Sequence, residues 1–261
     1  YCRVMEELAV HCASTAILVN AHQSIGLKAI LLFGTEEQKK KWLPDLASGK
    51  KIAAFSLTEP NAGSDAAGIE TTAVLEGDTW VINGKKQWTT NGSIADVLTV
   101  MAKVDGKVTA FIVEKGMEGM TITAPALEKV GIRGTRTTNL TFNNLRVPKE
   151  NVLGPIGGGL RVCLTALDYG RTTFGATCTG IAKDLFERAK GHAVKRVQFK
   201  KQLAHFPMIQ EKISRIAALT YAMDAATYFT AGLVDKGQKD FMLEAAMLKV
   251  FASEALWDII Y

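Results

Sequence analysis

The sequence of 261 residues lacks several patterns that would assign a protein to a class directly. Its four cysteines, Cys2, Cys12, Cys163 and Cys178, form no C-x-x-C pair and stand among apolar or small residues. We therefore expect buried free thiols in a reducing compartment. The four histidines do not have the spacing of a zinc site such as H-E-x-x-H, so no metal is expected.

Long apolar runs and a signal peptide are also missing. No uninterrupted apolar run reaches the length of a membrane span. The chain begins with Tyr1 rather than Met and ends with Tyr261 inside a helical pattern, so we expect both ends to be cut. A targeting segment or a membrane-associating region could therefore lie outside these residues, which leaves membrane association an open alternative.

Blocks of like charge are missing as well, although the net charge is +5. The densest cluster, Lys39 to Lys41, indicates a solvated helix end rather than a nucleic-acid site, so no nucleic acid is expected as a partner. A mild positive bias would suit a strongly anionic small-molecule substrate.

The hydrophobic period changes twice along the chain. Residues 1–32 have helical spacing interrupted only by Gly26, and Thr35 with Gln38 predicts a capping box at the start of another helix. From Lys51 the period becomes that of short strands. Helical spacing returns after a Gly/Pro connector at 148–159 and predicts a bundle of long helices, Leu160–Arg196, Pro207–Lys236 and Asp240–Tyr261.

The middle part is predicted as an antiparallel β-sandwich or barrel. Hairpin-type turns are expected at Asn83-Gly84, Asn91-Gly92 and Asp105-Gly106. The strand candidates are Ile52–Leu57, Thr71–Val74, Thr79–Ile82, Lys86–Thr90, Val97–Lys103, Val108–Glu114, Met120–Pro125 and Asn139–Val147. The expected organisation is thus the end of a helical domain at 1–50, a β domain at 51–150 and the first part of a helical-bundle domain at 151–261.

Three segments could bind a ligand. The segment Phe55–Asp65 is a strand that ends in a turn of small and hydroxyl residues, where exposed N–H groups suit a phosphate or the polar edge of a ring. Within it, Gly63 would let the backbone approach a ligand closely. Taken alone, an ordinary polar turn is the better interpretation.

The other two segments are equally open when taken alone. Gln87–Gly92 places an indole before two hydroxyls, which suits packing on a ring system, but a hairpin with a core tryptophan explains it as well. Arg196-x-x-Phe199 follows a helix just before the next helix is expected, and its arginine could clamp a phosphate. A surface arginine at a helix end is at least as good an interpretation.

The combination of the three segments resembles the acyl-CoA dehydrogenase family. The order Thr58–Asp65, then Trp88–Thr90, then Arg196-x-x-Phe199 is similar to the signature order of that family. The resemblance covers essentially the whole chain. Further segments resemble its very-long-chain branch, namely Ala21–Gly26, Leu31–Thr35, Ile209–Lys212 and Glu244–Ala246.

The resemblance implies FAD as cofactor. It places Thr58 on the pyrimidine edge of the flavin, Trp88 beside the isoalloxazine and Thr90 near its N5 atom. Arg196 would reach the FAD pyrophosphate of a neighbouring subunit, with Phe199 packed nearby, which implies a homodimer or a dimer of dimers. The full set implied for the cofactor is Phe55, Leu57, Thr58, Gly63, Ser64, Trp88, Thr89, Thr90, Arg196 and Phe199.

The resemblance also implies an acyl-CoA substrate. Ser64 and the stretch Asp168, Tyr169, Gly170 and Arg171 match positions that contact it. No residue of this chain is expected to be the catalytic base. Most of the family carries it as a glutamate beyond the region matched here, and a minority carries it at the position of Gly170.

Two further positions of interest are Glu254 and the pair Phe206-Pro207. Glu254 is expected to be a solvated surface residue rather than the base. Phe206-Pro207 stands where some members of the family have a polar pair near FAD, so those contacts are not expected here.

The implied function is the α,β-dehydrogenation of a long-chain fatty acyl-CoA to the trans-2-enoyl-CoA in fatty acid β-oxidation. Electrons would pass to an electron-transferring flavoprotein, in the bacterial cytoplasm or the mitochondrial matrix. A catalytically impaired, dehydrogenase-like assembly scaffold and a related flavin oxidase or monooxygenase remain the alternatives. The sequence leaves the acyl chain length open.

Overall fold

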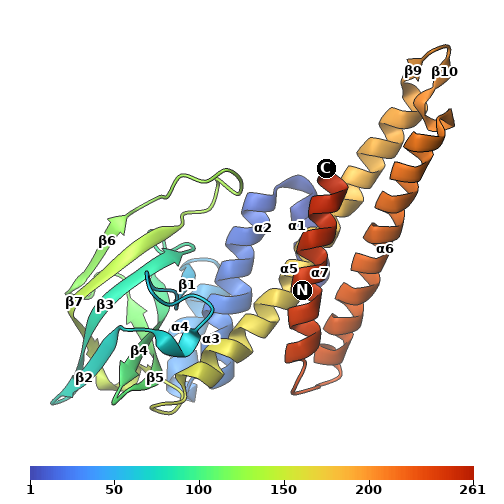
Figure 1. Ribbon diagram of the computed structural model, residues 1–261. Coiled ribbons are helices and arrows are strands. Elements are labelled where there is room, and N and C mark those ends of the chain that lie inside the picture. Colours follow the sequence, from blue (N-terminus) through green and yellow to red (C-terminus); the bar gives the residue numbers. More distant parts are fainter. The chain divides into compact units, whose positions relative to one another are not determined.

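The computed structural model describes residues 1–261, which form two compact units. One unit is continuous, from Leu18 to Gly170, and the other joins Tyr1–Ile17 to Arg171–Tyr261. The division runs through two helices, α2 (Ala13–Asn20) and α5 (Gly159–Lys195) (Figure 1). The first residues of the chain therefore pack with its last helices.

The expected N-terminal helix is confirmed in most of its length but is broken at Cys12. Helix α1 (Cys2–His11) ends there because the backbone of Cys12 is extended, with φ −159° and ψ 107°. Helix α2 runs on through a π-helix, η1 (Ala21–Gly26), into α3 (Leu27–Phe33). The predicted capping box is confirmed at the start of α4 (Glu36–Ala47), where Thr35 and Gln38 cap each other's backbone.

Eight strands of the unit Leu18–Gly170 form one mixed sheet. Its order is β6-β7-β3-β2-β4-β5-β8, with β1 paired to β4. Because β4 pairs in parallel with both β1 and β2, the all-antiparallel prediction is wrong at these two pairs. The strands are β1 (Ala53–Ser56), β2 (Thr72–Glu76), β3 (Thr79–Thr89), β4 (Val97–Val104), β5 (Lys107–Glu114), β6 (Met120–Ala124), β7 (Thr138–Pro148) and β8 (Val152–Leu153).

The turn predicted at Asn83-Gly84 is wrong, because these residues lie inside the single strand β3. The pairing of β3 with β7 shifts register between Ile82 and Gly84, and the φ of Gly84 is +154°. A Cβ atom at Gly84 would come within 2.7 Å of the Cα of Thr71. This glycine therefore serves a bulge and a close approach rather than a hairpin.

Of the other two turn predictions, the first is wrong and the second is confirmed. Asn91-Gly92 ends β3 but closes no hairpin, because β3 lies between β7 and β2 and not beside β4. Asp105-Gly106 is confirmed as the hairpin turn between β4 and β5, with φ of +48° and +76°. Positive φ at both positions is what a tight hairpin between twisted strands requires.

The central strand β4 is buried on both faces of the sheet. Val97 and Met101 belong to an apolar cluster that includes Trp42 of α4. Leu98 and Val100, on the opposite face, belong to a second cluster built around Trp80 and Phe111, whose rings meet edge to face at 5.4 Å. Alternate residues of one strand thus serve two cores.

The second unit is a helical bundle, as predicted. It contains α1, the later part of α5, α6 (Pro207–Asp235) and α7 (Met242–Ile260). Figure 1 shows α5 and α6 joined at their far end by a small hairpin, β9 (Val197–Gln198) and β10 (Lys201–Gln202). Its apolar core is Cys178, Ala182, Met223, Leu248, Ala252, Ala255 and Ile259.

The expectation that all four cysteines are buried needs correction. All four cysteines are free, and Cys163 and Cys178 are buried, but Cys12 is exposed at the break after α1. Burial raises the pKa of Cys178 to about 12. The helical stretch Ala13–Phe33 is also long and apolar enough to cross a membrane by length and composition. A core helix of a soluble protein has the same properties, so this stretch alone assigns no membrane.

Candidate functional site

Two of the sequence motifs lie side by side at the ends of β1 and β3. The amide of Gln87 donates to the carbonyl of Thr58 at 2.8 Å. The buried hydroxyls of Ser56 and Thr89 share a hydrogen bond of 2.8 Å. The turn that follows β1 is thereby fixed against the last residues of β3, although about thirty residues separate them.

Trp88 is exposed at this junction. It keeps 60% of its surface accessible, so the alternative of a core tryptophan is wrong. Its φ is +58°, which is an unfavourable backbone conformation for a bulky side chain. The register of β3 against β7 shifts between Lys86 and Thr89, and the Trp88 amide donates instead to the side chain of Asn139 at 3.2 Å. Strained backbone of this kind concentrates at ligand sites.

The remaining residues of the two motifs differ in exposure. Thr58 and Thr90 are partly exposed, and so are Phe55 and Leu57, which pack against the apolar cluster around Trp42. Thr89 is buried, with its hydroxyl turned to Ser56. Its contribution to a ligand site would therefore be through the backbone.

The turn after β1 holds its own shape. Glu59 and Ala62 exchange backbone hydrogen bonds of 2.9 and 3.2 Å, and the carboxylate of Asp65 accepts from the amide of Gly68 at 3.1 Å. Gly63 and Ser64 are exposed, and a Cβ atom at Gly63 would meet nothing within 4 Å. The packing of this chain therefore does not require a glycine at 63, and the space beside it is open to a ligand.

A buried ion pair beneath this junction was not predicted. The ammonium of Lys86 lies 2.6 Å from the carboxylate of Glu59, with exposed side-chain fractions of 0% and 3%. Lys86 also donates to the carbonyl of Leu57 at 3.0 Å, and Glu59 accepts from the amides of Glu70 and Thr71. The sequence shows a lysine in a strand and an acid in a turn, but not that they meet.

The two groups shift each other's ionisation. Burial lowers the pKa of Lys86 to about 8, against the opposing effect of Glu59. Burial by itself raises the pKa of Glu59, but the hydrogen bonds from Lys86, Thr71 and Glu70 outweigh it and hold that pKa below its ordinary value. The pair is therefore charged near neutral pH.

The stretch predicted to contact substrate lies on α5, where η1 packs against it. A Cβ atom at Gly170 would come within 2.7 Å of the side chain of Ile25, so a side chain at 170 would have to displace Ile25. Asp168 is buried, and the ring of Tyr169 lies 4.2 Å from the ammonium of Lys28. The fourth predicted residue, Arg171, begins the segment Arg171–Tyr261 of the helical unit.

Arg196 and Phe199 lie at the connection between α5 and α6. The next helix was expected to follow directly, but the β9–β10 hairpin lies between α5 and α6. Arg196 is exposed, and its carbonyl accepts from the amide of Leu203 at 2.9 Å. Phe199 is at the hairpin tip with φ +51° and an exposed fraction of 88%, and its ring lies 6.4 Å from that of Phe206.

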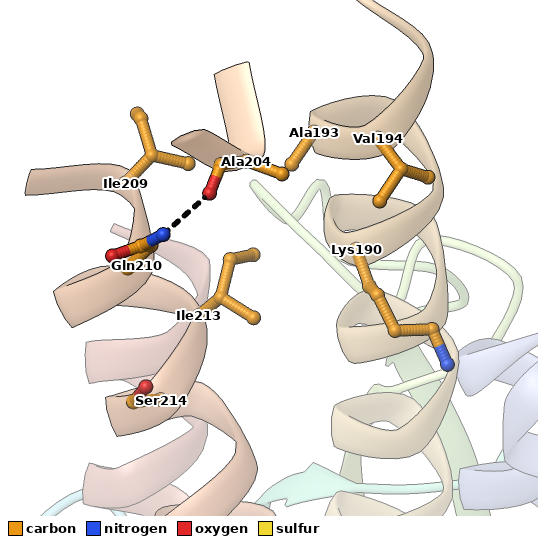
Figure 2. A pocket seen from close by; sticks show the side chains of 8 residues that line it. All are labelled: Lys190, Ala193, Val194, Ala204, Ile209, Gln210, Ile213 and Ser214. Carbon is orange, nitrogen blue, oxygen red and sulfur yellow. Dashed lines mark hydrogen bonds between the residues drawn. The ribbon is translucent and has the colours of Figure 1, made fainter. Parts of the chain in front are cut away.

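A cavity of about 170 Å³ lies between the last turns of α5 and the first turns of α6. Figure 2 shows aliphatic side chains from both helices around it, with Gln210 held by a hydrogen bond of 2.8 Å to the carbonyl of Ala204. The lining is Lys190, Ala193, Val194, Ala204, Ile209, Gln210, Ile213 and Ser214. This mainly apolar hollow belongs to the same end of the bundle as Arg196.

Glu254, considered in the sequence, and His22, a polar residue of η1, are not positioned for catalysis. Glu254 is exposed on α7, as expected. His22 has both ring nitrogens engaged, since Nδ1 accepts from the amide of Ala53 at 2.9 Å and Nε2 lies 3.0 Å from the carbonyl of Leu46. Because Nδ1 accepts, Nε2 must carry the proton and donate.

Comparison with known proteins identifies the class. Three family models match in succession: the acyl-CoA dehydrogenase N-terminal domain over residues 1–50, its middle domain over 54–145 and its C-terminal domain over 157–261. The chain therefore belongs to the acyl-CoA dehydrogenase family.

Individual relatives agree with this assignment. The chain is 43% identical to the human mitochondrial very long-chain specific acyl-CoA dehydrogenase, over 99% of the chain and 41% of that protein. It therefore spans less than half the length of the curated relatives it matches.

Solved structures are similar as well. Butyryl-CoA dehydrogenase from Megasphaera elsdenii superposes with a TM-score of 0.94 at 39% identity, covering 98% of this chain and 68% of that one. An acyl-CoA dehydrogenase from Bacillus anthracis complexed with FAD has a TM-score of 0.94 at 40% identity, covering 99% and 47%.

Proposed function

We propose that this chain binds FAD and forms part of an enzyme that oxidises long-chain fatty acyl-CoA to the trans-2-enoyl-CoA. The observation that carries this proposal is the exposed Trp88 on strained backbone, beside the linked ends of β1 and β3. An exposed indole held in a costly conformation is explained by a flat ring system that packs on it.

The residues present fit a flavin. Trp88 offers a flat apolar surface, and Thr58 and Thr90 offer partly exposed hydrogen-bonding groups on the same junction. The open space at Gly63 and the hydroxyl of Ser64 would accommodate further polar parts of the cofactor or the CoA arm. Bound FAD would supply the redox chemistry by accepting the hydride from the β-carbon of the substrate.

The α-proton must go to a base that lies within reach of the substrate's α-carbon. Gly170 has no group that could accept it, and Ile25 fills the space where its side chain would begin. Asp168 is taken as a substrate-positioning residue, together with Tyr169 and Arg171. We therefore assign the base to a glutamate outside these 261 residues.

Arg196 and Phe199 would complete the cofactor site of a second subunit. Both are exposed at the end of the helical unit, and a guanidinium is well suited to clamp a pyrophosphate. The acting unit would then be a homodimer or a dimer of dimers. An electron-transferring flavoprotein would reoxidise the cofactor, in a bacterial cytoplasm or a mitochondrial matrix.

The test compares Trp88→Ala with Trp257→Ala after addition of FAD. Trp257 is an equally exposed tryptophan, at 61%, but it lies on α7 and belongs to none of the three motifs. We expect the wild type and Trp257→Ala to show the absorption bands of bound flavin. Trp88→Ala should bind FAD with an affinity at least tenfold lower. In the enzyme of full length, palmitoyl-CoA without oxygen should bleach those bands.

Two results would contradict the proposal. A wild-type protein without affinity for FAD would remove its basis. Equal FAD affinity of Trp88→Ala and the wild type would show that the exposed indole serves another purpose.

A further inference from the structure

We propose that Glu59 and Lys86 are positioning residues that hold the two halves of the flavin site at a fixed separation. This inference rests on the proposed function, because it assigns the pair to the site formed by Thr58, Trp88 and Thr90. Neither residue is expected to touch the cofactor.

The pair is located between the segments that carry the ligand-facing residues. Glu59 directly follows Thr58, and Lys86 lies two residues before Trp88. The ammonium of Lys86 bonds both to the Glu59 carboxylate at 2.6 Å and to the Leu57 carbonyl at 3.0 Å. The backbone bond from Gln87 to Thr58 is the third bond between the two segments. Together the three bonds fix the end of β1 against β3.

The carboxylate also anchors a third segment. Glu59 accepts from the amides of Glu70 and Thr71, which lie directly before β2. The turn between β1 and β2, with Gly63 and Ser64 at its exposed side, is therefore closed at both ends by one carboxylate. A displacement of Glu59 would move the turn and the strand end together.

Stability alone does not explain a buried ion pair at this position. Removing two charges from water costs free energy that their attraction only partly returns, so apolar residues of similar volume often stabilise a fold as well or better. The other ion pairs of the unit Leu18–Gly170 stay partly solvated, as in Lys41–Glu114 with exposed fractions of 53% and 30%. The hydrogen bonds of this pair are directional: Lys86 donates to the carbonyl of Leu57, and Glu59 accepts from the amides of Glu70 and Thr71. Such bonds fix geometry in a way that apolar contacts do not.

The experiment replaces both charges at once with Glu59→Gln and Lys86→Met, since one change alone would strand a buried charge. The matched control is Lys41→Met with Glu114→Gln, a solvated pair of the same unit. FAD affinity is measured by calorimetry, the bound flavin by its absorption and fluorescence spectra, and the fold by near-UV circular dichroism and thermal unfolding.

We expect the E59Q/K86M protein to unfold cooperatively but to bind FAD at least tenfold more weakly, with a shifted flavin spectrum. The control pair should bind FAD like the wild type. Wild-type FAD affinity and spectrum in a folded E59Q/K86M protein would overturn the inference. A wild type without FAD affinity would instead overturn the proposed function, so the two failures are distinct.

A second measurement decides the question if the double variant does not fold. Lys86 faces the carboxylate of Glu59 and the thiol of Cys163 on α5, and burial places the pKa of the lysine near 8. In the wild type, FAD affinity should therefore weaken several-fold between pH 7 and pH 9.5 while circular dichroism stays constant. Unchanged affinity over that range would overturn the inference.

Discussion

His22 shows at the residue scale how one side chain can tie three segments together. It lies on η1 and bonds to the backbone of β1 at Ala53 and to the end of α4 at Leu46. Both bonds use the neutral ring. Burial lowers the pKa of His22, which reflects the cost of adding a proton to it in the folded protein.

Stability should therefore depend on pH through His22. Because its folded pKa lies below the unfolded value of about 6.5, the unfolded state binds more protons as the pH falls. The free energy of unfolding should be highest above that value and should decrease as the pH falls through the folded pKa. Urea unfolding at pH 7.5 and at pH 5 measures this.

Substitution isolates the effect. His22→Ala should lower the free energy of unfolding at pH 7.5 by about 1–3 kcal/mol, because two backbone groups lose their partner. It should also flatten the pH dependence. The control is His192→Ala on the exposed part of α5, and an identical pH dependence in His22→Ala would exclude His22 as its source.

The packing of α1 against α5 is the clearest example at the scale of elements. A Cβ atom at Gly180 of α5 would come within 2.2 Å of the carbonyl oxygen of Glu6. Glu6 is buried and accepts from Lys183 at 2.7 Å and from Tyr228 at 2.5 Å, so α1 cannot easily withdraw. The close approach of the two helices thus depends on a glycine.

Gly180→Ala and Gly191→Ala should consequently have opposite effects, although both lie on α5. The added methyl at 180 meets backbone and should destabilise by about 1–3 kcal/mol. The methyl at 191 meets nothing within 4 Å and should stabilise by about 0.5–1 kcal/mol. Chemical denaturation of both variants tests this, and equal effects would mean that α1 is not held closely on α5.

Local patterns predicted the elements better than their pairing. The period of 3.6 found α5, α6 and α7 within a few residues, and alternation found most strands, because both signals lie within one segment. The parallel pairs of β4, the bulge at Gly84 and the Lys86–Glu59 pair depend on segments that meet only after folding. The motifs around Thr58 and Trp88 were found as local sequence, but their adjacency was not derivable from it.

At the scale of the whole molecule, the question is whether the cofactor site is completed in trans. Arg196 is exposed at the end of the helical unit. Arg196→Ala should therefore leave thermal unfolding unchanged and weaken FAD binding by about 1.5–3 kcal/mol, the value of a charge-assisted hydrogen bond. Calorimetry measures the affinity, and Arg188→Ala, on the exposed surface of α5, serves as the control.

Dimers that contain two different variants show whether Arg196 binds the cofactor of the neighbouring subunit or that of its own subunit. Co-expression of Arg196→Ala subunits with Trp88→Ala subunits should restore one normal FAD site in each mixed dimer, because each variant supplies what the other lacks. If Arg196 served its own subunit, no site in the mixture would be normal. FAD content of the purified mixture, compared with each variant alone, gives the answer.

The π-helix η1 has a consequence for insertions and deletions. A π turn amounts to one residue more than an α-helix needs, and each residue corresponds to a rotation of about 100° around the helix. Deletion of the exposed Gln23 would let α2 and α3 join as one regular helix. Asn20, whose amide now lies 3.5 Å from the carbonyl of Gly170, would then keep its face, because the deletion removes only the surplus residue. A single-codon deletion inside the regular α3, by contrast, would rotate every side chain before it by about 100° relative to those after it.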